Sequence, residues 1–397
     1  MYSNHFKDIT NHNGAKIALN SFIKQKLSQY SSKRNYDFGD PNLNYVSVLS
    51  PAIRTRILTE INIIHEVKKY FNYNRVEKFI DEICWRTYWK GYLQHRPKIW
   101  IDYLNDLEDF DIDQYPHYLD AIEGNTSIPC FNIWVKDLKQ NGYLHNHTRM
   151  WFASIWIFQL NLPWQLGANL FFNHLLDADP ASNTLSWRWV AGLHTKGKSY
   201  RARRQNIEKY TSGRINTYGV DELPTHAITD ERIYNPMNLN LPKPIDVKKG
   251  SKTGLIIHQE DLSIIDFKKY DFLLIQASNY NPHNQSHHWN DFIDQALKNY
   301  ILQVKKTQEN KLTVYNWDNL NDIRVWKEKN KITHISIPYP SVGLLEKPIF
   351  KLEKQLEVRF NFLINQWDKL FWPYCDKGFF KLKKKIKPNL DILLNSA

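Results

Sequence analysis

The chain has 397 residues, a formal net charge of +12 and a sequence pI near 9.3. This length allows two hydrophobic cores, and the positive charge favours a polyanionic partner, nucleic acid rather than a membrane surface. Cys84, Cys130 and Cys375 are too few and too scattered for a disulfide framework, a four-cysteine zinc site or a four-cysteine iron–sulfur site. No apolar run approaches the roughly 20 residues that span a bilayer, so we expect a soluble cytoplasmic protein without membrane partners.

The first half of the chain has apolar residues at helical spacing, interrupted by segments with Asn, Gly or Pro. We expect helices over residues 15–30, 52–70, 76–93, 133–141 and 149–160. Residues 222–253 then change in character. They contain four prolines and the run Lys248-Lys249-Gly250-Ser251-Lys252, a composition typical of a linker.

The part of the chain after residue 253 alternates short apolar segments with longer helical ones. We expect buried parallel strands over 255–257, 272–275, 312–315 and 333–337, and crossover helices over 289–304 and 352–370. The pattern predicts a multi-domain protein: an all-α domain (1–221), the linker (222–253) and a doubly wound, Rossmann-like α/β domain (254–397). Residues 381–387, rich in Lys, are expected to form a solvated basic tail. The sequence makes no prediction of the oligomeric state.

Two triplets of polar and aromatic residues share the spacing i, i+3, i+4, namely Glu82, Trp85 and Arg86, and Asn146, Arg149 and Met150. On helices, each triplet would turn its side chains toward one place. Two such faces opposite each other would line a pocket with a carboxylate, an amide, two guanidinium groups and an indole ring. The alternative for Glu82 and Arg86 is a salt bridge that stabilises only their own helix.

A third polar group follows in the sequence, at Asp177, Asp179 and Asn183. Carboxylates at i and i+2 recur in calcium loops, but the Gly and the distal Glu of such a loop are missing, so we expect no metal. A heteroaromatic ring with N–H donors and carbonyl acceptors needs the partners that Asp, Arg and Asn supply. Trp187 and Trp189 stand beside them. A buried Trp is usually a packing residue, but a pair in this polar neighbourhood suggests a redox cofactor.

These residues together resemble the photolyase/cryptochrome flavoproteins over residues 14–210. Four segments carry the resemblance: YSSKRNYDF (30–38), FIDEICWRTYWKG (79–91), GYLHNHTRM (142–150) and WQLGANLFFNHLLDADPASNTLSWRW (164–189). The resemblance implies that the all-α domain is a photolyase-like FAD-binding domain. The cofactor residues it implies are Tyr30, Ser47, Leu49, Ser50, Arg86, Asn146, Arg149, Asp177, Asp179 and Asn183. Among these, Asp179 would accept from a flavin ring N–H and Asn183 would face flavin N5.

The resemblance also implies a reaction, the light-driven cleavage of cyclobutane pyrimidine dimers in DNA by electron transfer from photoexcited reduced FAD. Such an enzyme is a deoxyribodipyrimidine photo-lyase, a carbon–carbon lyase. The residues implied to meet a flipped dimer are Glu82, Trp85, Asn146, Met150 and Trp189. Trp187 and then Trp164 match the first members of an electron-hopping chain, with Trp100 and Tyr115 as candidates for the third. The Glu must be protonated to donate a hydrogen bond to a dimer carbonyl.

Several alternatives remain open on the sequence alone. The (6-4) photolyases typically have His at the positions of Asn146 and Met150 and Tyr at that of Trp189, so the chain resembles the cyclobutane-dimer pattern, including the DASH-type branch that prefers single strands. A cryptochrome-like blue-light photoreceptor and a helical DNA-binding protein without flavin are the other two functions. Arg201, Arg203, Arg204 and Lys209 are candidate phosphate contacts, with a solvated loop as the alternative.

The chain departs from the family pattern in its phosphate-binding segment, where residues 46–51 (VSVLSP) lack one of the hydroxyls of the usual Thr-Ser-x-Leu-Ser-Pro. It also departs in domain order. GLIIHQEDLSI (254–264) and ITHISIPY (332–339) resemble the opening strand and a later strand of the family's antenna domain, which normally precedes the FAD domain. We expect an antenna-like domain moved to the C-terminal side by circular permutation, with a possible second chromophore of unknown identity. An unrelated α/β domain is the alternative.

Overall fold

The computed structural model describes residues 6–40, 43–195, 197–220, 228, 230, 232–280, 282, 287–317 and 319–395. Up to residue 220 the described chain is helical. Its helices are α2 (His12–Gln25), α3 (Tyr30–Lys33), α4 (Ser50–Arg54), α5 (Glu60–Lys68), α6 (Tyr73–Gln94), α7 (Lys98–Asp109), α8 (Tyr118–Glu123), α9 (Pro129–Asn141), α10 (Asn146–Phe158), α11 (Trp164–His174), α12 (Pro180–Val190) and α13 (Arg204–Tyr210). None of the described helices combines the length and the apolarity needed to cross a membrane.

The helix predicted over residues 52–70 is wrong, because the chain breaks between α4 and α5. Arg56 has a φ of 56°, a left-handed conformation that no α-helix continues through. Thr59 then starts α5 by accepting a hydrogen bond from the Asn62 amide with its side chain. After the break, the guanidinium groups of Arg54 and Arg56 reach the loop that follows β1.

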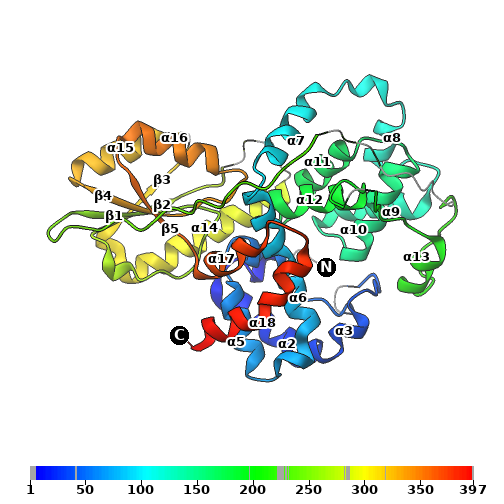
Figure 1. Ribbon diagram of the computed structural model, residues 1–397, viewed down its shortest axis with the longest axis horizontal. Helices are drawn as coiled ribbons and strands as arrows, with labels where there is room; N and C mark the ends of the chain where they lie inside the picture. The colour runs from blue at the N-terminus through cyan, green and yellow to red at the C-terminus, as the bar shows by residue number, and fades with distance from the viewer. Residues whose placement is uncertain are drawn as a thin grey trace.

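The second half of the chain holds a five-stranded parallel sheet of order β3-β2-β1-β4-β5 (Figure 1). Its strands are β1 (Thr253–Ile257), β2 (Phe272–Gln276), β3 (Leu312–Tyr315), β4 (His334–Pro338) and β5 (Phe360–Leu363). The four predicted strands are confirmed, and so is their parallel arrangement. Between α13 and β1 the described residues form no helix or strand.

The two faces of the sheet pack against different helices. Ile256 belongs to a core shared with α15 (Leu320–Lys329) and α16 (Glu346–Leu356). Its neighbours Leu255 and Ile257 point to the opposite face, as alternation along a strand requires, and pack with Trp289 of α14 (His287–Gln308). That core is continuous with the core of the helical half. The sheet is therefore joined to the helices through one apolar interior.

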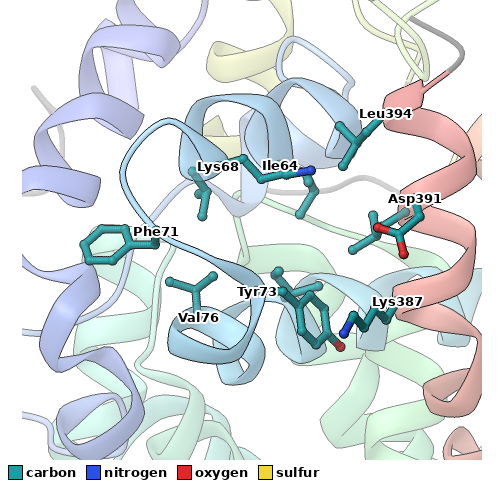
Figure 2. A pocket seen from close by; sticks show the side chains of 11 residues that line it. Ile64, Lys68, Phe71, Tyr73, Val76, Lys387, Asp391 and Leu394 are labelled. Carbon is teal, nitrogen blue, oxygen red and sulfur yellow. The ribbon is translucent and has the colours of Figure 1, made fainter.

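Two predictions near the C-terminal side of the sheet are wrong. The helix predicted over 352–370 is three elements, the end of α16, β5 and α17 (Gln366–Phe371). The basic tail predicted over 381–387 is part of α18 (Phe379–Asn395), whose apolar side packs on α6 (Figure 1). A cavity of about 40 Å³ between α5, α6 and α18 is lined mainly by apolar side chains such as Ile64 and Val76 (Figure 2). It is too small for a nucleotide-sized ligand.

Candidate functional site

Two buried carboxylates lie at the start of α12. Asp179 caps this helix, because its side chain accepts a hydrogen bond of 2.8 Å from the Ser182 amide. Arg86 of α6 donates to Asp179 Oδ2 over 2.6 Å and lies 3.5 Å from Asp177 Oδ2. Arg149 of α10 donates to Asp177 Oδ2 over 3.4 Å. The two triplets recognised in the sequence therefore converge on this pair of carboxylates.

The pKa of Asp179 is set by two opposing effects. Burial acts to raise it, but the nearby cations, Arg86 and Arg54 before Lys90, and the capping hydrogen bond outweigh burial and hold the pKa of Asp179 below its usual range. Asp179 is therefore an ionised acceptor at neutral pH. Asn183, one turn further along α12, donates from Nδ2 to the Ala168 carbonyl of α11 over 2.7 Å.

Arg54 connects the carboxylate pair to the α/β half of the chain. Its guanidinium donates twice to Glu260 in the loop after β1, over 2.8 and 2.6 Å, and its Nε lies 3.9 Å from Asp179. Arg56 lies beside it and pairs with Asp261 at 3.1 Å and with Asp368 of α17. Our sequence reasoning missed these residues. The signal available was the pair of arginines two residues apart in SPAIRTR, opposite an adjacent Glu-Asp pair after a strand.

The substrate-facing residues implied by the resemblance lie on α6, α10 and α12. Glu82 is half-buried and lies 3.5 Å from Arg34; burial raises the pKa of its carboxyl although Arg34 opposes the shift. Asn146 is exposed at the start of α10, whereas Met150 is half-buried. Trp189 is half-buried and stacks on Tyr200 with ring centroids 5.6 Å apart.

Trp85 has an unforeseen neighbour. Phe379, the first residue of α18, stacks face to face on its indole, with centroids 3.8 Å apart and planes 8° apart. One face of the Trp85 ring is thus covered by a residue from the far end of the described chain.

The tryptophans of the implied electron route are buried. Trp187 lies edge-on to Phe171 at 5.1 Å and to Trp156 at 6.3 Å. Trp164 stacks on Tyr103 at 5.7 Å, and Tyr103 in turn lies 5.3 Å from Trp100. Of the two candidates for a third member, Trp100 is thus connected to Trp164 through one ring. The ring contact of Tyr115 is with Phe110 instead.

The remaining predicted residues lie around this centre. Tyr30 is buried against Phe22 and Phe79, and burial raises the pKa of its hydroxyl. Leu49 is buried, and Ser47 and Ser50 are half-buried. Of the candidate phosphate contacts, three are exposed (Arg203, Arg204 and Lys209), whereas the guanidinium of Arg201 lies 3.6 Å from the centre of the Phe158 ring.

The side chains around Asp179 match the needs of a flavin ring. Ser182 Oγ and Arg54 Nε are buried and have no hydrogen-bond partner among the described residues. A buried polar group without a partner is costly, so such atoms mark places where a ligand can supply the missing bond. Together with the ionised Asp179 and the amide of Asn183, they offer both donors and acceptors. No group of three or more His, Cys, Asp or Glu among the described residues could hold a metal ion.

Comparison with known proteins gives the same assignment. Residues 79–240 match the protein-family model described as the FAD binding domain of DNA photolyase. A deoxyribodipyrimidine photo-lyase of Agrobacterium fabrum is 32% identical over 186 residues, which cover 45% of this chain and 38% of that protein. One from Buchnera aphidicola subsp. Baizongia pistaciae is 26% identical over 249 residues, 57% of this chain and 50% of that protein.

Among solved structures, a bacterial class III photolyase from Agrobacterium tumefaciens is 28% identical with a TM-score of 0.44, covering 51% of this chain and 43% of that chain. The chain spans between 31% and 50% of the length of the first curated relatives it matches. The matched region includes Glu82, Arg86, Arg149 and the two carboxylates of α12. Residues 79–240 of this chain are therefore similar to the FAD binding domain of DNA photolyase.

Proposed function

We propose that the protein is a light-dependent DNA-repair enzyme that splits cyclobutane pyrimidine dimers. The observation that carries the proposal is the position of Glu82: it is half-buried on the same face of α6 as Trp85, and one turn from Arg86, which reaches the carboxylates of α12. Burial also raises the pKa of Glu82. When bound and reduced, FAD would supply an electron on photoexcitation to cleave the dimer, and the electron would return to the flavin afterwards. A photosensor has no need of a protonated carboxyl at this place.

The chain's own residues have separate tasks in this proposal. Asp179, held ionised by Arg86, accepts from a ring N–H of the cofactor and orients it. Glu82, whose pKa burial raises, donates a hydrogen bond to a dimer carbonyl in its protonated form, which stabilises the charge that develops there. The exposed amide of Asn146 donates a second bond. Trp85 and Trp189 provide apolar walls for the two linked pyrimidines that have left the stack.

The electron route we propose begins at Trp187 and continues through Trp164. The stacking of Trp164 on Tyr103, and the contact of Tyr103 with Trp100, favour Trp100 over Tyr115 as the outer member. Tyr103 Oη is buried without a hydrogen-bond partner among the described residues. With no proton acceptor among those residues, Tyr103 is assigned the role of a bridge between the two indoles rather than that of a terminal radical.

We further propose that residues 1–221 form the catalytic domain and 254–397 an antenna-like domain, joined by 222–253. The two segments that resemble the antenna domain lie on β1 and β4, which pair with each other in the parallel sheet. Their adjacency supports an antenna-like fold for this part of the chain. The chromophore of such a domain is not assigned.

A cryptochrome-like photoreceptor is the second candidate, and the Phe379 contact is the observation that favours it. A ring stacked on Trp85 reduces the indole surface open to a flipped dimer. The assay that separates the two functions is repair of a thymine-dimer oligonucleotide, single- and double-stranded, by flavin-loaded, reduced protein in blue light and in the dark. We expect light-dependent repair. Bound, reduced flavin without repair of either substrate would overturn the photolyase and favour the photoreceptor.

The proposal predicts a pH dependence of repair. The folded pKa of Glu82 lies above the value of about 4.3 of a free glutamate. The protonated donor therefore persists above that pH and is lost as the pH rises through the raised pKa. We expect the repair yield per absorbed photon to fall in that range. Glu82→Gln should remove this loss, because an amide donates at every pH, whereas Glu123→Gln on exposed α8 should keep the wild-type profile. A pH profile that E82Q leaves unchanged would contradict this role.

A further inference from the structure

Helix α18 presents two different faces. Its buried stripe is apolar and packs on α6, with members at i, i+3, i+7, i+11 and i+14: Phe379, Leu382, Ile386, Leu390 and Leu393. A second stripe is exposed and consists of Phe380, Lys384 and Lys387, at i, i+4 and i+7, with Lys387 at the edge of the α6 contact. The buried stripe fixes the helix against the scaffold, so the exposed stripe has a defined position.

Phe380 is the unusual member of the exposed stripe. Its side chain is 76% exposed, although the preceding residue, Phe379, is buried on Trp85. The rings of Phe379 and Phe380 have centroids 6.5 Å apart. An exposed phenyl ring therefore follows directly after the ring that stacks on Trp85, where the proposed function puts a flipped lesion.

The surroundings of Phe380 are positively charged. Lys381 is neutralised by Asp376 at 2.7 Å and Lys383 by Asp81 at 2.7 Å. Lys384 is exposed and has no ion pair among the described residues. Lys387 lies over the Tyr73 ring at 5.9 Å and lines the same cavity as Asp391 (Figure 2), but it forms no ion pair with any described residue.

We infer that this exposed stripe is a DNA-binding surface, on which Phe380 stacks against a base beside the lesion and Lys384 and Lys387 contact phosphates. An aromatic ring among cations suits single-stranded or unstacked nucleic acid, because each base offers a π face and each nucleotide a negative charge. One phenyl ring is too small an apolar patch for a stable protein interface, and the polar stripe around it lacks the apolar width of a membrane-binding helix. The inference rests on the proposed function for the position of the lesion.

The test is equilibrium binding of the full-length, flavin-loaded protein in the dark, measured by fluorescence anisotropy with single-stranded oligonucleotides that contain or lack a thymine dimer. Phe380→Ala is expected to weaken binding roughly tenfold with an unchanged salt dependence, since one stacked base is lost. Lys384→Ala should make the negative slope of log K against log salt less steep by about 0.7, because one phosphate contact is lost. Phe380→Trp should bind as tightly as the wild-type protein, because an indole ring also stacks on a base. Leu119→Ala on α8, 65% exposed, and Lys351→Ala on α16 are the matched controls.

The outcomes separate this inference from the proposed function. Binding by F380A within about twofold of wild type, or equal losses in F380A and L119A, would overturn the role of α18. Binding is measured without light, so it does not depend on repair. If F380A binds DNA more weakly but the wild-type protein repairs no dimer, the DNA-binding role of α18 stands and only the proposed photolyase activity fails. Circular dichroism and thermal unfolding of each variant check that the overall fold is kept.

Discussion

Replacement of Asp179 by alanine is expected to abolish FAD binding and to lower the free energy of unfolding by about 3–5 kcal/mol. Asp179 accepts from Arg86 at 2.6 Å and lies 3.9 Å from Arg54, and all three side chains are largely buried. Without the carboxylate, two guanidinium groups remain in the interior with less compensating charge. The start of α12 also loses its cap, which costs about 1 kcal/mol more. Chemical denaturation and the flavin absorbance of the purified protein measure both effects.

Two variants separate the causes of this loss. Asp111 is the N-cap of a short 3-10 helix (Ile112–Gln114) and accepts a hydrogen bond from the Asp113 amide. It is exposed and has no ion pair among the described residues. Asp111→Ala should therefore cost about 1 kcal/mol or less. Asp179→Asn keeps the size and a capping oxygen but removes the charge, so it should recover the cap and not the pairing with Arg86. Equal stability of D179A and D111A would show that the buried ion pairs contribute nothing.

Replacement of Arg56 by methionine is the second change for which we expect a large effect, a loss of about 3–5 kcal/mol in the free energy of unfolding. Arg56 pairs with Asp261 and Asp368, and the charges of these groups and of Glu60 keep the pKa of Arg56 high in spite of its burial. Methionine fills much of the volume but leaves the carboxylates buried and unpaired. Thermal and urea unfolding of the flavin-loaded protein provide the measurement.

Arg232 is the matched control for Arg56. It also pairs with two carboxylates, Asp106 at 2.7 Å and Asp230 at 2.9 Å, but its side chain is 38% exposed. Water and salt screen these pairs, so Arg232→Met should cost about 1 kcal/mol or less. If the two methionine variants were equally stable, burial of the Arg56 network would have no energetic consequence.

The parts of the fold that could be predicted are those with a local pattern. Short runs such as Leu255–Ile257 are apolar at every position, as a strand buried on both faces requires. β5 was missed because Phe360–Leu363 alternates apolar and half-buried residues between two helices, so its apolar positions also fit helical spacing. α18 was missed because its lysines obscure the apolar stripe that packs on α6.

The candidate site divides in the same way. Arg86 and Arg149 each belong to a triplet with the spacing i, i+3, i+4, which the sequence shows directly. Both arginines reach Asp177 because the helix faces that carry the two triplets meet there. Phe379 and Glu260 could not be found in this manner. Each reaches its partner from more than 200 residues away in the sequence, as the 206-residue separation between Arg54 and Glu260 illustrates. No local periodicity encodes such pairings, which only the packed chain brings about.

The packing of α18 on α6 has a consequence for how the protein assembles. Lys383 and Asp81 form an ion pair across 302 residues of sequence, and Trp85 gains its stacked neighbour from the same distant helix. Contacts of such long range form late in folding, because the chain entropy of the intervening loop must be lost first. During synthesis, α6 leaves the ribosome long before its partner exists. The side of α6 that carries Trp85 is therefore covered only after α18 has emerged. Until then, this apolar side of α6 remains exposed and available to chaperones.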